Sequence, residues 1–162
     1  MEIDSVVKLK SSDGKEIEIP KKATYRSGLL KGIIEDCPDN TEFPVKQVNS
    51  SLLEKIKEYL VHYQDEEPQK IEAPLKSTNF KECVSEWDYN FLGEDIDFIF
   101  DLINASNYMD IKPLLEISSA KLGSKIKGMT SETVKKDFEI PPLTKEENDQ
   151  IMVLKKYLEE NL

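Results

Sequence analysis

Strand-forming segments in this chain of 162 residues are confined to its first 45 residues, and helical patterns fill the remainder. Val6–Lys10 and Glu16–Ile19 are short β-prone runs. The Asp13-Gly14 pair between them supplies the positive backbone dihedrals that a tight hairpin prefers. Phe43–Val45 is a third short extended segment. Early strands followed by a long run of helices predict an α+β fold, in which a small three-stranded sheet is covered by helices.

Seven helices are predicted from apolar residues that recur every three or four positions. Ser50 or Ser51 is expected to cap the second helix, and Thr144 with Glu147 matches a capping box at the start of the last one. Gly128 is expected to stop the fifth helix. The expected helices cover residues 27–37, 52–63, 85–92, 96–109, 111–126, 130–138 and 144–158.

The charge balance excludes several classes of function. The chain has 32 acidic and 22 basic side chains, which gives a net charge of −10. Such a chain repels a phosphate backbone, and its sequence has no dense basic stretch, so nucleic-acid binding is disfavoured. The sequence predicts no membrane span and no signal peptide. We therefore expect a cytoplasmic and nuclear location, with reduced thiols.

Catalytic and metal-binding residues are scarce in this sequence. Cys37 and Cys83 are its only cysteines and His62 its only histidine, which excludes a cysteine-rich zinc site and a multi-histidine site. His62 closes a predicted helix, where a structural or surface role is expected. No phosphate-binding, hydrolase or metalloprotease motif occurs in the sequence. We expect a protein that is not an enzyme and that needs no cofactor or metal.

The domain organisation follows from where the helical pattern lapses. Residues 64–82, which include the acidic run Asp65–Glu67, show neither the helical nor the strand period of apolar residues. This lack of a pattern predicts a long, flexible acidic loop on the surface. A main domain over residues 1–128 and an extension over residues 129–162 are expected. The extension has more apolar side chains than two short helices can bury against each other. These side chains either pack back on the main domain or need a partner protein to cover them. The apolar residues concerned are Val134, Phe138, Ile140, Leu143, Ile151, Val153, Leu154, Tyr157 and Leu158.

Five segments, in order, resemble the S-phase kinase-associated family, whose members link F-box proteins to cullin in SCF ubiquitin ligases. The resemblance covers nearly the whole chain. It implies a BTB/POZ domain with two carboxy-terminal helices, acting as a noncatalytic adaptor in ubiquitin-dependent protein degradation. The matching segments are Val7–Gly14, Trp87–Leu92, Asn107–Leu115, Ile126–Thr130 and Phe138–Ile140.

The resemblance also implies two partner-binding sites. Asn107 and Tyr108 match the family positions implicated in binding the cullin amino-terminal domain. The F-box would bind the carboxy-terminal helices, and a weak homodimer is implied for the free protein. The residues carried over for the F-box are Ile126, Val134, Phe138, Ile140, Ile151 and Tyr157.

The chain departs from the family pattern near its end. Tyr157-Leu158 stands where the family usually has Trp-Cys, and Pro141–Thr144 replaces a linker of sequence Asn-Asp-Phe-Thr. Lys145 follows that threonine where some members carry a glycosylated proline, so we expect no such modification. Two alternatives share the core: an elongin C-like adaptor, which would stop before the terminal helices, and a BTB/POZ self-association module.

Overall fold

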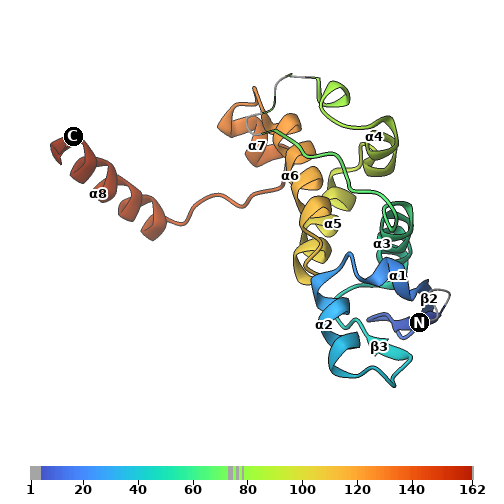
Figure 1. The fold of residues 1–162 in the computed structure, drawn as a ribbon. Helices are drawn as coiled ribbons and strands as arrows, with labels where there is room; N and C mark the ends of the chain where they lie inside the picture. Colours follow the sequence, from blue (N-terminus) through green and yellow to red (C-terminus); the bar gives the residue numbers. More distant parts are fainter. Residues whose placement is uncertain (1–4, 73–74, 76, 78, 162) are drawn as a thin grey trace. The chain divides into compact units, whose positions relative to one another are not determined.

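The computed structural model describes residues 5–72, 75, 77 and 79–161 and has the predicted α+β organisation (Figure 1). Its strands are β1 (Val6–Lys10), β2 (Glu16–Pro20) and β3 (Glu42–Pro44). Its helices are α1 (Lys21–Thr24), α2 (Gly28–Asp36), α3 (Ser50–His62), the 3₁₀ turn η1 (Phe80–Glu82), α4 (Glu86–Leu92), α5 (Ile96–Tyr108), α6 (Lys112–Ile126), α7 (Ser131–Asp137) and α8 (Lys145–Asn161).

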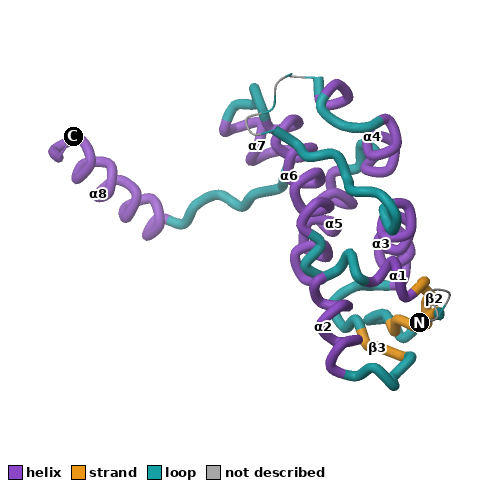
Figure 2. Tube along the Cα trace, in the orientation of Figure 1, coloured by secondary structure: helices purple, strands orange, loops and turns teal. Residues whose placement is uncertain are grey.

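The three strands form one mixed sheet, drawn in orange in Figure 2. β1 lies in the centre, antiparallel to β2 and parallel to β3. Leu9 pairs with Ile17 on one side and with Phe43 on the other, and all three side chains are buried. Buried and exposed residues alternate along β1 and β2, so one face of the sheet packs on the core.

The predicted hairpin is confirmed, and its turn also contacts the start of α3. The Ser11 amide donates to the Lys15 carbonyl at 2.9 Å, and Gly14 has a φ of +82°, which glycine adopts without strain. The Asp13 carboxylate accepts hydrogen bonds from the Ser50 amide at 2.8 Å and from its hydroxyl at 2.6 Å. Hydrogen bonds from Ser50 and Ser11 hold the pKa of Asp13 well below its usual range.

The core lies between the sheet and the buried faces of the helices. α3 contacts β2, α1 and α5, which places it at the centre of the first part of the chain. The amphipathic patterns of the sequence correctly predict this packing. Fully buried apolar side chains of the sheet and helices include Leu9, Ile19, Leu30, Phe43, Leu53, Ile56, Tyr59, Leu60, Leu92, Ile99, Leu102 and Met109.

Three local details differ from the sequence prediction. The chain forms a short helix, α1, directly after β2, where no helix was expected. α3 is capped by Asn49, whose side-chain oxygen accepts from the Leu52 amide at 2.9 Å, and not by Ser50 or Ser51. The loop expected over 64–82 ends earlier, because η1 buries Phe80 against the core.

The structure divides into two compact units, Met1–Lys125 and Ile126–Leu162. The first unit contains the sheet, the helices from α1 to α5 and nearly all of α6, and the second contains α7 and α8. The sequence-based boundary after residue 128 lies three residues later. Among the described residues, no helix combines the length and apolar character that crossing a membrane takes.

Candidate partner-binding surfaces

The solvent-facing side of α5 is the first candidate surface. Ile99 and Leu102 point into the core, whereas Phe100 and Asn107 are exposed and Ile103 is half-buried. Phe100, Ile103 and Asn107 recur at intervals of three and four residues, so they share one side of the helix. Tyr108, half-buried, ends the helix beside them. We call Phe100, Ile103, Asn107 and Tyr108 the α5 face.

Two hydrogen bonds, the first of them buried, fix the end of α5 to the start of α2. The Ser27 hydroxyl donates to the Met109 carbonyl at 2.5 Å, and the Gly28 amide donates to the Asp110 carbonyl at 3.0 Å. Asp110 has a φ of +51°, which turns the chain sharply into α6. The Asn107-Tyr108 pair predicted for cullin therefore lies at the end of a helix whose orientation is set by the core.

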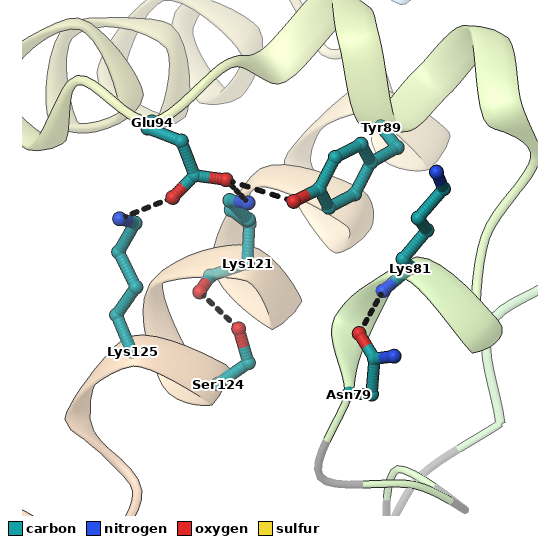
Figure 3. Close-up of polar contacts among 7 residues, drawn as sticks. All are labelled: Asn79, Lys81, Tyr89, Glu94, Lys121, Ser124 and Lys125. Atoms are coloured by element: carbon teal, nitrogen blue, oxygen red, sulfur yellow. Dashed lines mark hydrogen bonds and ion pairs between the residues drawn. The ribbon is translucent and has the colours of Figure 1, made fainter.

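The carboxyl half of α6 is fastened by an ion-pair cluster, shown in Figure 3. Glu94 accepts from Lys121 Nζ at 2.5 Å, from Lys125 Nζ at 2.7 Å and from the Tyr89 hydroxyl at 3.2 Å. The Lys121 ammonium also lies 4.5 Å from the centre of the Tyr89 ring and 5.2 Å from that of Phe80. The two lysines lower the pKa of Glu94 to about 2. We call these five residues the Glu94 clamp.

α7 is short and well capped at both ends. Its first turn is capped by the Thr130 hydroxyl, which accepts a backbone hydrogen bond at 3.2 Å. Glu139, with a φ of +49°, ends it, and the Ile140 amide donates back to a carbonyl of the last turn at 2.9 Å. This reversal leaves Val134 and Phe138 half-buried and Ile140 exposed. In the described chain, none of the α7 residues is fully buried.

The predicted capping box at the start of α8 is confirmed. The Glu147 carboxylate accepts from the Thr144 amide at 2.8 Å, and the Glu147 amide donates to the Thr144 hydroxyl at 3.3 Å. The Thr144 hydroxyl also donates to that carboxylate at 2.8 Å. These hydrogen bonds, the backbone one first, lower the pKa of Glu147. The box satisfies amides that the helix itself leaves unpaired, so α8 begins at a defined residue.

α8 displays an uncovered apolar face. No residue in the part of α8 whose side chains are described is buried, and Val153 and Tyr157 are 70% and 61% exposed. At about 100° per residue, five apolar side chains fall within an arc of about 160°, whereas Met152 lies outside it. The α8 face consists of Ile151, Val153, Leu154, Tyr157 and Leu158.

The structure distributes the six residues predicted for the F-box over three helices. Ile126 is half-buried and is the last residue of α6. Val134, Phe138 and Ile140 belong to α7 and its end, and Ile151 and Tyr157 belong to the α8 face. The resemblance supplied only some of each surface. Its candidates omit Val153, Leu154 and Leu158, which the sequence analysis named among the surplus apolar residues of the extension. They also omit Phe100 and Ile103, which helical spacing would have added to Asn107.

The single histidine of the chain has a structural contact. The His62 ring stacks on Trp87, with ring centres 3.6 Å apart and planes 1° apart. Cys37 and Cys83 are free thiols. Searched over the described residues, the structure has no group of three or more His, Cys, Asp or Glu side chains that could hold a metal ion.

Comparison with known proteins identifies the family. Residues 5–65 match the family model described as Skp1 family, tetramerisation domain. The chain is 36% identical over 156 residues to the S-phase kinase-associated protein 1 homolog of Tetrahymena thermophila, an alignment that covers 95% of this chain and 94% of the relative. It is 37% identical over 149 residues to the E3 ubiquitin ligase complex SCF subunit sconC of Arthroderma otae, covering 91% and 90%.

A third relative supports the same assignment. The chain is 36% identical over 155 residues to suppressor of kinetochore protein 1 of Schizosaccharomyces pombe, which covers 91% of this chain and 93% of the relative. These alignments extend through nearly the full length of both proteins, and the matched sheet-containing region agrees with the observed fold. The resemblance stated from the sequence motifs is confirmed: the chain belongs to the Skp1 family.

Proposed function

We propose that this chain is a noncatalytic adaptor subunit of an SCF-type E3 ubiquitin ligase complex, which joins an F-box protein to a cullin. The name of the Arthroderma otae relative describes it as an SCF subunit, and the chain matches it over 91% of its own length. An elongin C-like protein would end before α7 and α8, which are present here. The adaptor proposal therefore accounts for both units of the chain.

The uncovered α8 face is the observation that carries the proposal. Five apolar side chains on one helix, all at least 39% exposed, are typical of a surface that another protein covers. An F-box is a short helical motif, and helices commonly bind through apolar residues spaced along one face. We therefore assign F-box binding to the α8 face together with Ile126, Val134, Phe138 and Ile140.

Cullin binding is assigned to the α5 face. Asn107 and Tyr108 lie on it, and Phe100 and Ile103 extend the apolar area along the same helix. A rigid helix end of this kind can provide a few buried anchor residues without reordering when the partner binds. The α5 and α8 faces belong to different units, so each partner has its own contact residues.

Two substitutions in the full-length chain test the assignment of F-box binding to the α8 face and of cullin binding to the α5 face. Ile151→Glu should weaken binding of a purified F-box protein by at least about 30-fold, because it buries a charge without a partner in the contact. Met152→Glu is the matched control, because it adds the same charge to the same helix outside the α8 face. Tyr108→Lys should weaken binding of a cullin amino-terminal domain by a similar factor and leave F-box binding within twofold.

Calorimetry or surface plasmon resonance with each partner gives both affinities. If Ile151→Glu and Met152→Glu behave alike, the α8 face is not the F-box site. If Tyr108→Lys releases the F-box protein and spares the cullin, the two faces are assigned the wrong way round. Circular dichroism of each variant checks that the helices are retained.

Self-association is the second candidate function, because the matched family model is described as a tetramerisation domain. Light scattering of the purified chain distinguishes the adaptor from the self-association module. A dilute adaptor should be largely monomeric or weakly dimeric, whereas a stable tetramer at micromolar concentration would favour the self-association module. The proposed location is the cytoplasm and the nucleus, in keeping with two free thiols.

A further inference from the structure

Two basic side chains, Lys22 in the short helix α1 and Arg26 just after it, bind an acidic segment of the same chain. Lys22 pairs with Asp65, and Arg26 Nη1 lies 2.5 Å from a carboxylate oxygen of Glu67. More than forty residues of sequence separate the members of each pair. We call Lys22 and Arg26 the α1 basic site, and Asp65–Pro68 the acidic strap.

Arg26 contacts the strap in a way that suits a peptide. One guanidinium nitrogen donates to the Glu67 carboxylate, and the other donates to the main-chain carbonyl of Glu66 at 2.9 Å. A planar guanidinium can hold two acceptors at once in a fixed geometry. An inorganic anion would supply one charged group only, whereas these contacts use a carboxylate and a neighbouring backbone carbonyl together.

A recess of about 280 Å³ lies beside the α1 basic site. The rings of Tyr25 and Tyr63 line it together with Pro68 of the strap, and Tyr25 is 45% exposed. Lys112, from the start of α6, is a second cation in its wall beside Arg26, and Asp110 also lines the recess. The recess gives room for an apolar or aromatic side chain that flanks an acidic stretch.

The strap is held weakly enough to be displaced. The side chains of Lys22 and Asp65 are 44% and 58% exposed, and that of Glu67 is 82% exposed. Exposed ion pairs contribute little to stability because water and salt screen them. A competing acidic peptide could therefore replace the strap without disturbing the core.

We propose that the α1 basic site docks an acidic peptide segment of a partner protein, and that the chain's own acidic strap occupies this site as an intramolecular competitor. The occupant is a peptide and not a nucleic acid, because Arg26 binds a carboxylate together with a neighbouring peptide carbonyl. Lys22 and Arg26 belong to neither the α5 face nor the α8 face, so the proposal does not depend on the adaptor proposal.

Fluorescence anisotropy on the full-length chain provides the test. The probe is a fluorescein-labelled synthetic peptide with the sequence of residues 63–70, which carries the strap in trans. The opened variant is Asp65→Asn with Glu67→Gln. If the strap occupies the site about 90% of the time, opening it should tighten probe binding by about tenfold, which equals about 1.4 kcal/mol.

Matched variants separate the site from general electrostatics. Glu18→Gln with Asp39→Asn removes the same two charges from exposed positions outside the strap and should leave probe binding within twofold of wild type. Arg26→Gln in the opened variant should weaken binding by at least tenfold. Lys22→Gln, at an exposed position, serves as a second site variant and should weaken it by about threefold, and circular dichroism confirms that each variant is folded.

Three outcomes would overturn the proposal. Equal probe affinity for the opened variant and its charge-matched control would show that the strap does not compete. Unchanged binding after both Arg26→Gln and Lys22→Gln would place the probe elsewhere. Equal or tighter binding of a fluorescein-labelled single-stranded DNA of eight nucleotides would show that the surface attracts negative charge without selecting a peptide.

Discussion

Glu94→Gln should destabilise the first unit, because it removes the counter-ion of a buried lysine while keeping the side-chain shape. The Lys121 side chain is only 4% exposed, whereas Glu94 is 62% exposed. Breaking a fully buried ion pair costs about 3–5 kcal/mol, and an exposed pair is worth about 0–1 kcal/mol. For a buried cation with an exposed partner we expect a loss of about 1–3 kcal/mol in the free energy of unfolding.

A double-mutant cycle isolates the charge interaction. Lys121→Met should change stability by less than about 1 kcal/mol, because methionine keeps the contacts with the Tyr89 and Phe80 rings and leaves no buried charge. In the Lys121→Met background, Glu94→Gln should lose less than half as much stability as it does alone. The remaining loss belongs to Lys125, which lies 2.7 Å from the other carboxylate oxygen.

Urea unfolding followed by fluorescence of the single tryptophan, Trp87, measures these differences. Glu58→Gln is the control, because Glu58 forms an exposed pair with Lys55 at 3.0 Å and should change stability by less than about 0.5 kcal/mol. A loss for Glu94→Gln no larger than that of the control would refute the clamp.

The stability that the Glu94 clamp contributes should depend on pH. The folded-state pKa of Glu94 is about 2, below its ordinary value of 4.5. A carboxyl whose pKa is depressed by folding contributes stability above its unfolded pKa and loses it as the pH falls through the folded pKa. The stability difference between wild type and Glu94→Gln should therefore be full above pH 5 and shrink steadily between about pH 4.5 and 2.

Three further substitutions are predicted from single contacts. Gly28→Ala places a Cβ in steric overlap with the Asp110 carboxylate, so thermal unfolding should show a loss of about 1–3 kcal/mol in stability. The double variant Gly28→Ala with Asp110→Gly should recover part of that loss. Thr144→Ala removes the hydroxyl of the α8 capping box, which caps the Glu147 amide, and should reduce helical circular dichroism, with a loss of about 1 kcal/mol from that helix. Tyr63→Phe removes a hydroxyl that donates to a buried carboxylate at 2.8 Å, so urea unfolding should show a loss of about 1–3 kcal/mol.

Local sequence signals predicted the elements whose causes are local. The Asp13-Gly14 turn, the two β-prone runs that it joins and the Thr144 capping box each depend on residues a few positions apart, and the structure confirms all three. The class of fold followed from the order of these elements. α1 was missed because Lys21–Thr24 is a single turn, too short to show a helical period.

Features that depend on tertiary contacts were not predictable in this way. Asn49 caps α3, and Ser50 is its first helical residue, where the Ser50 amide and hydroxyl both donate to Asp13 in the hairpin turn. Lys121 occupies an inward position of α6 that a periodic analysis reserves for apolar residues, and only the rings and the carboxylate of the Glu94 clamp make its burial tolerable. Helix periodicity gives no sign of such a partner.

The candidate site residues also divide into those that the sequence indicated and those that only the tertiary structure reveals. The family resemblance supplied Asn107, Tyr108 and the six F-box candidates, and helical spacing identified the apolar side of the last helix. Neither says which apolar residues stay uncovered, because exposure depends on what the rest of the chain packs against. The structure adds that information for Val153 and Leu154, which are 70% and 58% exposed.

An uncovered α8 has a thermodynamic consequence for partner binding. Isolated helices shorter than about 12–15 residues are marginal in water even when they are rich in alanine. α8 is only slightly longer, at 17 residues, and it includes Val153 and several acidic side chains, which favour a helix less than alanine does. Without buried contacts, its helical state depends heavily on the Thr144 capping box. A partner that binds the α8 face must then also stabilise the helix. Thr144→Ala, which lies outside that face, should weaken F-box binding by about fivefold, matching its cost of about 1 kcal/mol to the helix. Unchanged affinity alongside reduced helicity would show that the F-box does not require a helical α8.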